Sequence, residues 1–72
     1  MKVVLAGAYG KLGSDILKAL LSAGHEVVAA DMIDRDVEGV DKNAYTYKKL
    51  DVTNTDALKG LCDGADAVIT TV

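Results

Sequence analysis

The sequence predicts an α/β fold, in which helices cover a parallel β-sheet. Short apolar runs rich in valine and alanine alternate with amphipathic segments, and strands buried on both faces of a parallel sheet have such continuous apolar runs. Half of the residues are hydrophobic but only 4% are aromatic, so the apolar content is mostly alanine, valine, leucine and isoleucine. This composition is typical of helices packed on a parallel sheet.

Length, charge and cysteine content exclude several classes of protein. The 72 residues suffice for one small domain, which buries only about 60% of the surface of its unfolded chain. The net charge of −3 and the scattered Lys and Arg residues argue against a nucleic-acid surface. No apolar run approaches the roughly 20 residues of a membrane span and no signal peptide is recognisable, so we expect a cytoplasmic protein without membrane contact. The single cysteine, Cys62, excludes an internal disulfide and a multi-cysteine metal site, and we expect a half-buried structural thiol.

The first predicted strand, residues 3–6, leads through a glycine-rich turn into an amphipathic helix. We expect this helix to begin at Gly10 or Lys11 and to end at Ala23, with Gly24 as its left-handed stop. Its expected apolar face has residues at helical spacing, namely Leu12, Ile16, Leu17, Leu20 and Leu21.

The turn has a glycine at every third position, in the sequence Gly7-Ala8-Tyr9-Gly10-Lys11-Leu12-Gly13. Gly7 and Gly10 allow a tight turn and leave room for a pyrophosphate at the unpaired amides of the helix N-terminus. The helix dipole attracts the same anion. Gly13 lies one turn inside the helix, where a missing Cβ permits close packing on the strand. A glycine triplet alone also occurs in ordinary strand-to-helix turns, so the interpretation depends on further residues.

Two more strands are expected in the middle of the chain. Residues 26–30 form an apolar strand that ends at Asp31, and the helix before it makes the two strands parallel, with a right-handed crossover. Residues 32–44 are polar and irregular and predict a loop rather than a crossover helix. Residues 45–50 have strand composition and are followed by Asp51 and Val52.

A second helix and a fourth strand complete the pattern. Thr53 with Asp56 resembles a capping box, and Gly64 ends the helix. The apolar face of this helix consists of Ala57, Leu58, Leu61 and Cys62. A buried strand is expected at residues 67–72. We therefore expect residues 1–72 to be the N-terminal portion of a domain truncated after strand four, with open edge strands that favour edge association or a homo-oligomer.

Three features lie at the carboxyl ends of predicted strands, where ligands bind in open parallel sheets. They are the glycine turn, Asp31 and Asp51, in a sheet of expected strand order 3-2-1-4 with helices on both faces. Asp31 lies 18 residues beyond Gly13, near the position of a carboxylate that accepts hydrogen bonds from an adenosine ribose. Its neighbour Met32 is included in the candidate site. The alternative is an ordinary aspartate at the end of a strand.

The charge of Asp31 favours NAD over NADP, because a carboxylate repels a 2′-phosphate. NADP stays the less favoured alternative, since Lys11 or Arg35 could pair with that phosphate.

Asp51 and its neighbour Val52 are candidates for binding the adenine. The Asp51 carboxylate would accept a hydrogen bond from the exocyclic amine, and the main chain of Val52 would contact the ring edge. Equally, Asp51 could be a helix-entry carboxylate beside Thr53.

Tyr45 and Lys49 have the Tyr-x-x-x-Lys spacing of a catalytic pair, but on a strand four residues span about 13 Å. We therefore interpret both as surface residues.

Taken together, these motifs resemble the extended or atypical short-chain dehydrogenase/reductase superfamily, which has a Rossmann-type, doubly wound fold. The run from Gly64 to Ile69 belongs to the same resemblance. The resemblance implies that Gly7 to Leu12 hold the pyrophosphate, Asp31 the ribose, and Asp51 and Val52 the adenine. It also implies that the main chain of Thr70, Thr71 and Val72 passes along the phosphates and the nicotinamide ribose.

The same resemblance implies the dinucleotide-binding part of an NAD-dependent oxidoreductase or of a sugar-nucleotide epimerase or dehydratase. In that superfamily the catalytic Ser or Thr, and the helical Tyr and Lys, come after the fourth strand. No catalytic or metal residue is therefore assigned, and the small-molecule substrate of the full-length protein stays open. Two alternatives are a non-catalytic dinucleotide sensor with a protein partner, and a binder of S-adenosylmethionine, which also favours an acidic residue after strand two.

Overall fold

A computed structural model describes residues 1–51 and 53–71 of the chain. Within these residues strands and helices alternate, with a short 3₁₀ turn, η1, before the third strand. The elements are β1 (Lys2–Ala6), α1 (Lys11–Ser22), β2 (Glu26–Asp31), η1 (Lys42–Ala44), β3 (Thr46–Lys49), α2 (Thr55–Cys62) and β4 (Ala67–Thr70). The predicted order of elements is confirmed.

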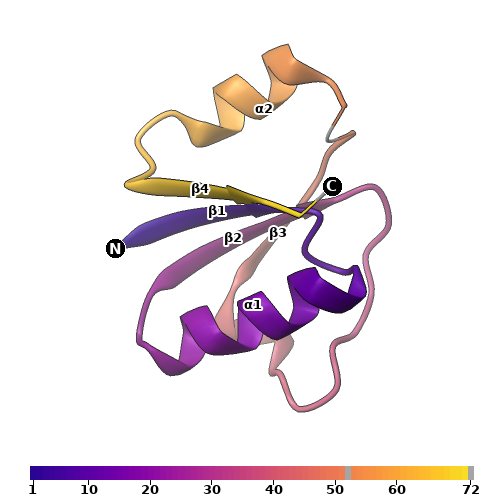
Figure 1. Cartoon of the computed structure of the whole chain (residues 1–72), viewed down its shortest axis with the longest axis vertical. Helices are drawn as coiled ribbons and strands as arrows, with labels where there is room; N and C mark the ends of the chain where they lie inside the picture. The colour runs from indigo at the N-terminus through magenta and orange to yellow at the C-terminus, as the bar shows by residue number, and fades with distance from the viewer. Residues whose placement is uncertain (52, 72) are drawn as a thin grey trace.

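The described strands form one parallel sheet of order β3-β2-β1-β4. In the central pair, Val4 lies opposite Val28 and Leu5 opposite Ala29. Helix α1 covers one face of the sheet and α2 the other (Figure 1). The expected α/β fold, Rossmann-like with strand order 3-2-1-4, is confirmed, and the carboxyl ends of all the described strands meet at one edge.

The core lies between α1 and the two central strands. Leu5 of β1, Leu17 of α1 and Val27 of β2 are almost completely buried, and so is Ala29. These residues come from the predicted apolar runs, because a strand between two neighbours with helices on its faces has no face open to water.

Helix α1 begins after Gly10 and is followed by Gly24, whose φ of 84° is the left-handed stop expected there. The prediction that Leu12 belongs to the buried face of this helix is wrong, because Leu12 is 62% exposed. The helix packs on the sheet through Gly13 and Leu17, which are buried. Leu12 precedes Gly13, and adjacent helical residues point about 100° apart, so its side chain projects outward.

Strand β4 is less buried than its apolar composition predicts, because Val68 is 45% exposed. The strand lies at the edge of the sheet and pairs with β1 on one side. Helix α2 has only 8 residues, and none of those described in it is buried, so it covers β4 thinly. Cys62 at the end of α2 is half-buried, as expected.

The start of α2 differs from the expected capping box. The N-cap is Asn54, whose side chain accepts a hydrogen bond from the main-chain N–H of Ala57. The Thr53 hydroxyl instead donates to Asp51 at 2.6 Å. Both Asn and Thr are common N-caps. Here the Thr53 hydroxyl is bonded to the Asp51 carboxylate, and Asn54 caps the helix instead.

The connection from β2 to β3 is a loop, as expected, with η1 at its end. The prediction that Tyr45 is a surface residue is wrong, because only 9% of it is exposed and it belongs to the core cluster below α1. Lys49 is exposed, as expected. A crossover helix between β2 and β3 would cover the sheet beside α1. The connection is a loop, and Tyr45 packs into the core there instead.

Candidate functional site

The turn between β1 and α1 is held tightly against the end of β2. Gly7 has a φ of 80°, a left-handed conformation that glycine adopts without strain. Its main-chain N–H donates to the carbonyl of Ala30 at 2.8 Å, while its own carbonyl accepts from Gly10 at 3.4 Å. The first glycine therefore makes the reversal that sends the chain from strand to helix.

Gly13 is the contact point between α1 and this turn. A Cβ on Gly13 would lie 2.1 Å from the carbonyl oxygen of Gly7 and 3.0 Å from the main chain of Ala8. Real Cβ atoms do not approach main chain so closely, and the main chain has no flexible end that could move away. The predicted close approach at Gly13 is confirmed, but the main chain that it meets belongs to the turn after β1 and not to the strand itself.

The N-terminus of α1 presents its amides where the strands end. Gly10 is the N-cap and has no side chain to bond them, and the first main-chain bond of the helix runs from Ser14 N–H to the carbonyl of Gly10. Helix geometry leaves the preceding amides of Lys11, Leu12 and Gly13 without an intrahelical acceptor. Together with the positive end of the helix dipole, they form a place suited to an anionic phosphate.

Asp31 at the end of β2 is joined to this turn directly. Its Oδ2 accepts a hydrogen bond from the main-chain N–H of Tyr9 at 3.0 Å, and its Oδ1 accepts from Met32 at 2.7 Å. The two predicted features, the glycine turn and the carboxylate, therefore lie in contact. A carboxylate oxygen has two lone pairs, so each oxygen is able to accept a second bond from a hydroxyl.

A cavity of about 240 Å³ opens between the turn and the segment after β2. Met32 and Ile33 are 49% and 60% exposed, an unusual exposure for large apolar side chains beside a carboxylate. The cavity is lined by Tyr9, Gly10, Asp31, Met32, Ile33 and Arg35. Sequence reasoning missed Ile33, although two large apolar residues directly after a strand-ending aspartate were a usable signal.

Thr71 closes the other side of the turn. Its main-chain N–H donates to the carbonyl of Ala6 at 3.0 Å, and its hydroxyl donates to the carbonyl of Gly7 at 2.8 Å. Thr70, the last residue of β4, pairs with Ala6. The predicted residues Thr70 and Thr71 thus lie beside the glycine turn, and the Thr71 hydroxyl fixes the turn. Val72 lies outside the described residues.

Asp51 lies at the same edge of the sheet, after β3. Leu50 donates a main-chain hydrogen bond to the carbonyl of Asp31 at 3.0 Å, so the ends of β2 and β3 stay together. Oδ1 of Asp51 accepts from the hydroxyl and the N–H of Thr53, and these bonds lower the pKa of the Asp51 carboxyl. Asp51 thus has the geometry of a helix-entry carboxylate beside Thr53, which the sequence offers as the alternative to a contact with adenine. Val52 lies outside the described residues.

The side chain of Tyr9 is bonded to the connection between β2 and β3. Its hydroxyl donates to Oδ1 of Asp34 at 2.9 Å and lies 3.1 Å from the hydroxyl of Tyr45. Burial raises the pKa of the Tyr9 hydroxyl, and the bonds to Tyr45 and Asp34 raise it further. The Tyr9 hydroxyl is therefore protonated and bound to the connection between β2 and β3.

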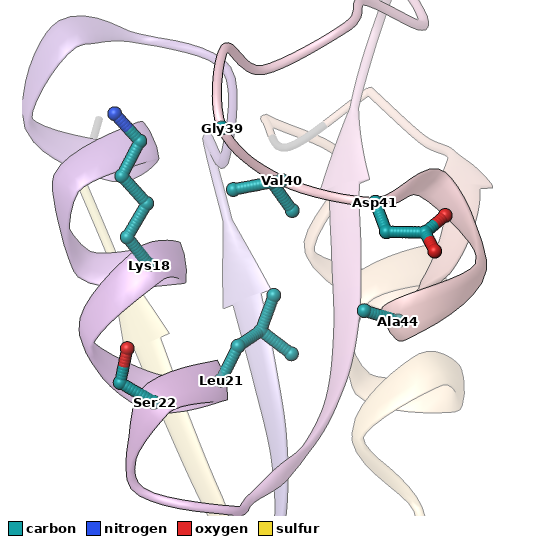
Figure 2. Close-up of a pocket in the computed structure, with 7 residues that line it drawn as sticks. All are labelled: Lys18, Leu21, Ser22, Gly39, Val40, Asp41 and Ala44. Atoms are coloured by element: carbon teal, nitrogen blue, oxygen red, sulfur yellow. The ribbon is translucent and has the colours of Figure 1, made fainter.

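A second cavity, of about 260 Å³, lies elsewhere, between the second half of α1 and the loop before β3 (Figure 2). Its lining contains none of the predicted site residues and consists of Lys18, Leu21, Ser22, Gly39, Val40, Asp41 and Ala44. The glycine turn, Asp31 and the cavity beside them are therefore the candidate site.

Two negative findings apply to the part of the chain that the structure describes. No cluster of three His, Cys, Asp or Glu side chains is arranged there to hold a metal ion. No helix in it combines the length and the apolar character that crossing a bilayer requires.

Comparison with known proteins gives relatives over almost the whole chain. A family described as NAD(P)H-binding matches residues 7–72. A search of curated proteins gave no match.

Solved structures reproduce the fold closely. A protein from Bacteroides thetaiotaomicron described as a candidate epimerase has 37% identity and a TM-score of 0.86, over 99% of this chain and 32% of that one. WbmH of Bordetella bronchiseptica, solved in complex with NAD⁺, has 27% identity and a TM-score of 0.77, over 99% of this chain and 25% of that one. Vestitone reductase from alfalfa has 27% identity and a TM-score of 0.77, over 99% of this chain and 24% of that one. The chain thus spans between 24% and 32% of the length of these three proteins.

Proposed function

The chain belongs to the NAD(P)H-binding family, and on that premise we propose that its preferred ligand is NAD, with the pyrophosphate on the turn between β1 and α1 and the adenosine ribose on Asp31. The hydrogen bond from Tyr9 N–H to Asp31 Oδ2 carries this proposal. It brings a carboxylate, which suits ribose hydroxyls, next to a helix N-terminus, which suits phosphates. A dinucleotide joins both groups in one molecule.

The pyrophosphate would lie on the amides at the start of α1. The stretch from Gly7 to Gly13 would form the binding turn, with Ala8, which is buried, and Tyr9 contributing main chain only. Gly10 brings no side chain to the approach. Leu12 would place its exposed side chain beside the ligand, which gives a reason for an apolar residue there. Lys11 is exposed at the same helix start and would add a positive charge.

The adenosine would occupy the cavity beside Asp31. Met32 and Ile33 provide apolar surface there, suited to the face of an adenine ring. Asp51 and Val52 would approach the adenine edge, and the main chain at Thr70, Thr71 and Val72 would follow the phosphates toward the nicotinamide ribose. When bound, a nicotinamide dinucleotide supplies hydride transfer, and these residues would hold and orient it.

The preference for NAD over NADP follows from charge. The Asp31 carboxylate repels a 2′-phosphate on the ribose that it binds. Arg35 lines the same cavity and would partly offset this repulsion, which makes NADP the weaker ligand rather than an excluded one.

For the whole protein, we propose a role as an oxidoreductase or a sugar-nucleotide epimerase or dehydratase acting on a small molecule. The support is the likeness to longer proteins described as a candidate epimerase and a reductase. The described residues supply the cofactor part of such an enzyme.

Calorimetric titration with NADH, NADPH and S-adenosylmethionine tests the proposal. NADH should bind most tightly of the three ligands. Asp31→Asn should reduce the ratio of the NADH and NADPH affinities by roughly tenfold, because it removes the carboxylate charge that repels the 2′-phosphate of NADPH. Asp63→Asn removes an exposed carboxylate next to α2 and serves as the matched control. Binding of S-adenosylmethionine without NADH would assign the site to the other ligand class.

A further inference from the structure

The chain contains 3 tyrosines, and all of them gather around the amino group of Lys42. Lys42 Nζ lies 5.3 Å from the ring centroid of Tyr9, 6.0 Å from that of Tyr45 and 5.7 Å from that of Tyr47. The rings of Tyr9 and Tyr47 stack with centroids 5.7 Å apart. Asp34 completes the group through an ion pair with Lys42. We refer to Tyr9, Asp34, Lys42, Tyr45 and Tyr47 as the tyrosine clasp.

The hydroxyl of Tyr9 is the centre of the tyrosine clasp. Its one proton goes to Asp34 Oδ1, at 2.9 Å. Tyr45, 3.1 Å away, must therefore be the donor in its hydrogen bond with the Tyr9 oxygen. Both partners belong to the connection between β2 and β3, so a residue of the glycine turn fastens that connection.

Tyr9 also acts through its main chain. The same residue donates its N–H to Asp31 Oδ2 at 3.0 Å. A second member of the clasp, Tyr47, donates its hydroxyl to the carbonyl of Asp31 at 3.0 Å. The end of β2 is thus held from the turn and from β3, through residues of the same clasp.

We propose that Tyr9 is a positioning residue, which uses the tyrosine clasp to fix residues 32–45 and the Asp31 carboxylate in the arrangement that binds the dinucleotide, before the ligand arrives. The inference rests on the proposed function and goes beyond it by assigning a role to the Tyr9 hydroxyl, which bonds to Asp34 and Tyr45. A loop that is ordered in advance does not lose conformational freedom on binding, so its order increases affinity.

The first experiment measures amide hydrogen exchange of residues 32–45 in the protein without ligand. Tyr9→Phe keeps the ring that stacks on Tyr47 and removes only the hydroxyl. We expect these amides to exchange roughly three- to tenfold faster in Tyr9→Phe, because the hydroxyl's bonds to Asp34 and Tyr45 are lost at a partly exposed site. Exchange in β1 should stay unchanged, which separates a loosened loop from a destabilised fold.

The second experiment measures NADH affinity in a double-variant cycle. Tyr9→Phe and Asp34→Ala should each weaken binding by roughly three- to tenfold, and the double variant should lose clearly less than the two single losses combined, because the Tyr9–Asp34 hydrogen bond is lost in both single variants. Asp34→Asn keeps an acceptor for the Tyr9 hydroxyl and should recover part of the affinity. Glu38→Ala, an exposed carboxylate of the same loop, is the matched control.

Unchanged loop exchange in Tyr9→Phe, or additive losses in the double variant, would overturn the inference while the proposed function stands. A wild-type protein that binds no dinucleotide would instead overturn the proposed function, and the exchange experiment would still decide whether Tyr9 holds the loop.

Discussion

The main-chain N–H of Tyr9 donates a 3.0 Å hydrogen bond to Oδ2 of Asp31, although the two residues lie 22 positions apart in the sequence. This bond joins the turn after β1 to the end of β2, and the Thr71 hydroxyl joins the same turn to the end of β4 at 2.8 Å. The turn is therefore fixed from both sides at the edge where the strands end. A binding turn held in this way presents its amides in one conformation.

The close packing of Gly13 should make it intolerant of any side chain. Gly13→Ala places a Cβ 2.1 Å from the carbonyl oxygen of Gly7, so α1 or the turn must shift. We expect a loss of about 3 kcal/mol in the free energy of unfolding, as for other forced overpacking. Urea unfolding followed by circular dichroism measures this loss.

The matched control for this change is Gly60→Ala. Gly60 lies in α2, and a Cβ at this position would meet no atom within 4 Å beyond its own helix backbone and chain neighbours, so the substitution meets open space. It should stabilise the protein by about 0.5 to 1 kcal/mol through helix propensity. Equal effects of the two substitutions would contradict the close approach at Gly13.

The N-cap of α2 is Asn54 rather than Thr53, and two alanine substitutions test this. Asn54→Ala removes the acceptor for the Ala57 N–H and should cost about 1 kcal/mol of stability. Thr53→Ala removes an exposed hydrogen bond to Asp51 and should cost less. The two free energies of unfolding are compared under the same conditions, and a larger loss for Thr53→Ala would restore the capping box expected from the sequence.

The order of elements was predictable because it depends on local patterns, and the strand order follows from the right-handed crossovers of a doubly wound fold with that order of elements. The buried runs at residues 3–6 and 27–30 belong to the two strands that have a neighbour on each side, and their apolar composition reflects this. Gly13 was predictable for the same reason, since close helix packing excludes a Cβ and leaves glycine at that position. Asp31 followed from its spacing after the turn.

The errors lie where a residue's environment depends on a distant partner. Tyr45 has the sequence context of a surface strand residue, but its hydroxyl meets Tyr9 from 36 positions away and its ring fills the place of a crossover helix. The exposure of Val68 depends on how little α2 covers, which the apolar composition of β4 does not reveal. No local pattern contains these contacts.

The ion pair between Asp34 and Lys42 predicts a defined pH dependence of stability. The bond to Lys42 lowers the pKa of Asp34 below 3.8, so its contribution is present above that value and is lost as the pH falls through the lower, folded pKa. The bond to Asp34 raises the pKa of Lys42 above 10.5, so its contribution is present below that value and is lost as the pH rises through the folded pKa.

Chemical unfolding of wild type and Asp34→Asn from acidic to alkaline pH measures this effect. The difference between the two proteins should be largest near neutral pH and should shrink toward both extremes. Other carboxyls, including Asp51, titrate in both proteins and cancel in the difference. Glu38→Gln is the control, and a difference that is constant with pH would show that the ion pair does not contribute through charge.

The edges of the sheet differ in a way that predicts which one associates. Of the described strands, β3 and β4 are the outer ones. Strand β3 ends in the exposed lysines Lys48 and Lys49, and charged side chains protect an edge from pairing with another chain. Strand β4 has the sequence AVIT without a charge, and Val68 is 45% exposed. In a sample of the 72-residue chain, any association should therefore involve β4 rather than β3.

Sedimentation equilibrium at increasing concentration tests the association, because pairing through β4 should raise the average mass. Val68→Lys places a charge on that strand and should return the chain toward a monomer, whereas Thr46→Lys adds the same charge to β3 and should have little effect. A mass that stays monomeric at every concentration contradicts the association. A stronger effect of Thr46→Lys would assign the association to β3. Lys48 and Lys49 would then be too few to protect that edge, whose main-chain groups are otherwise open to pairing.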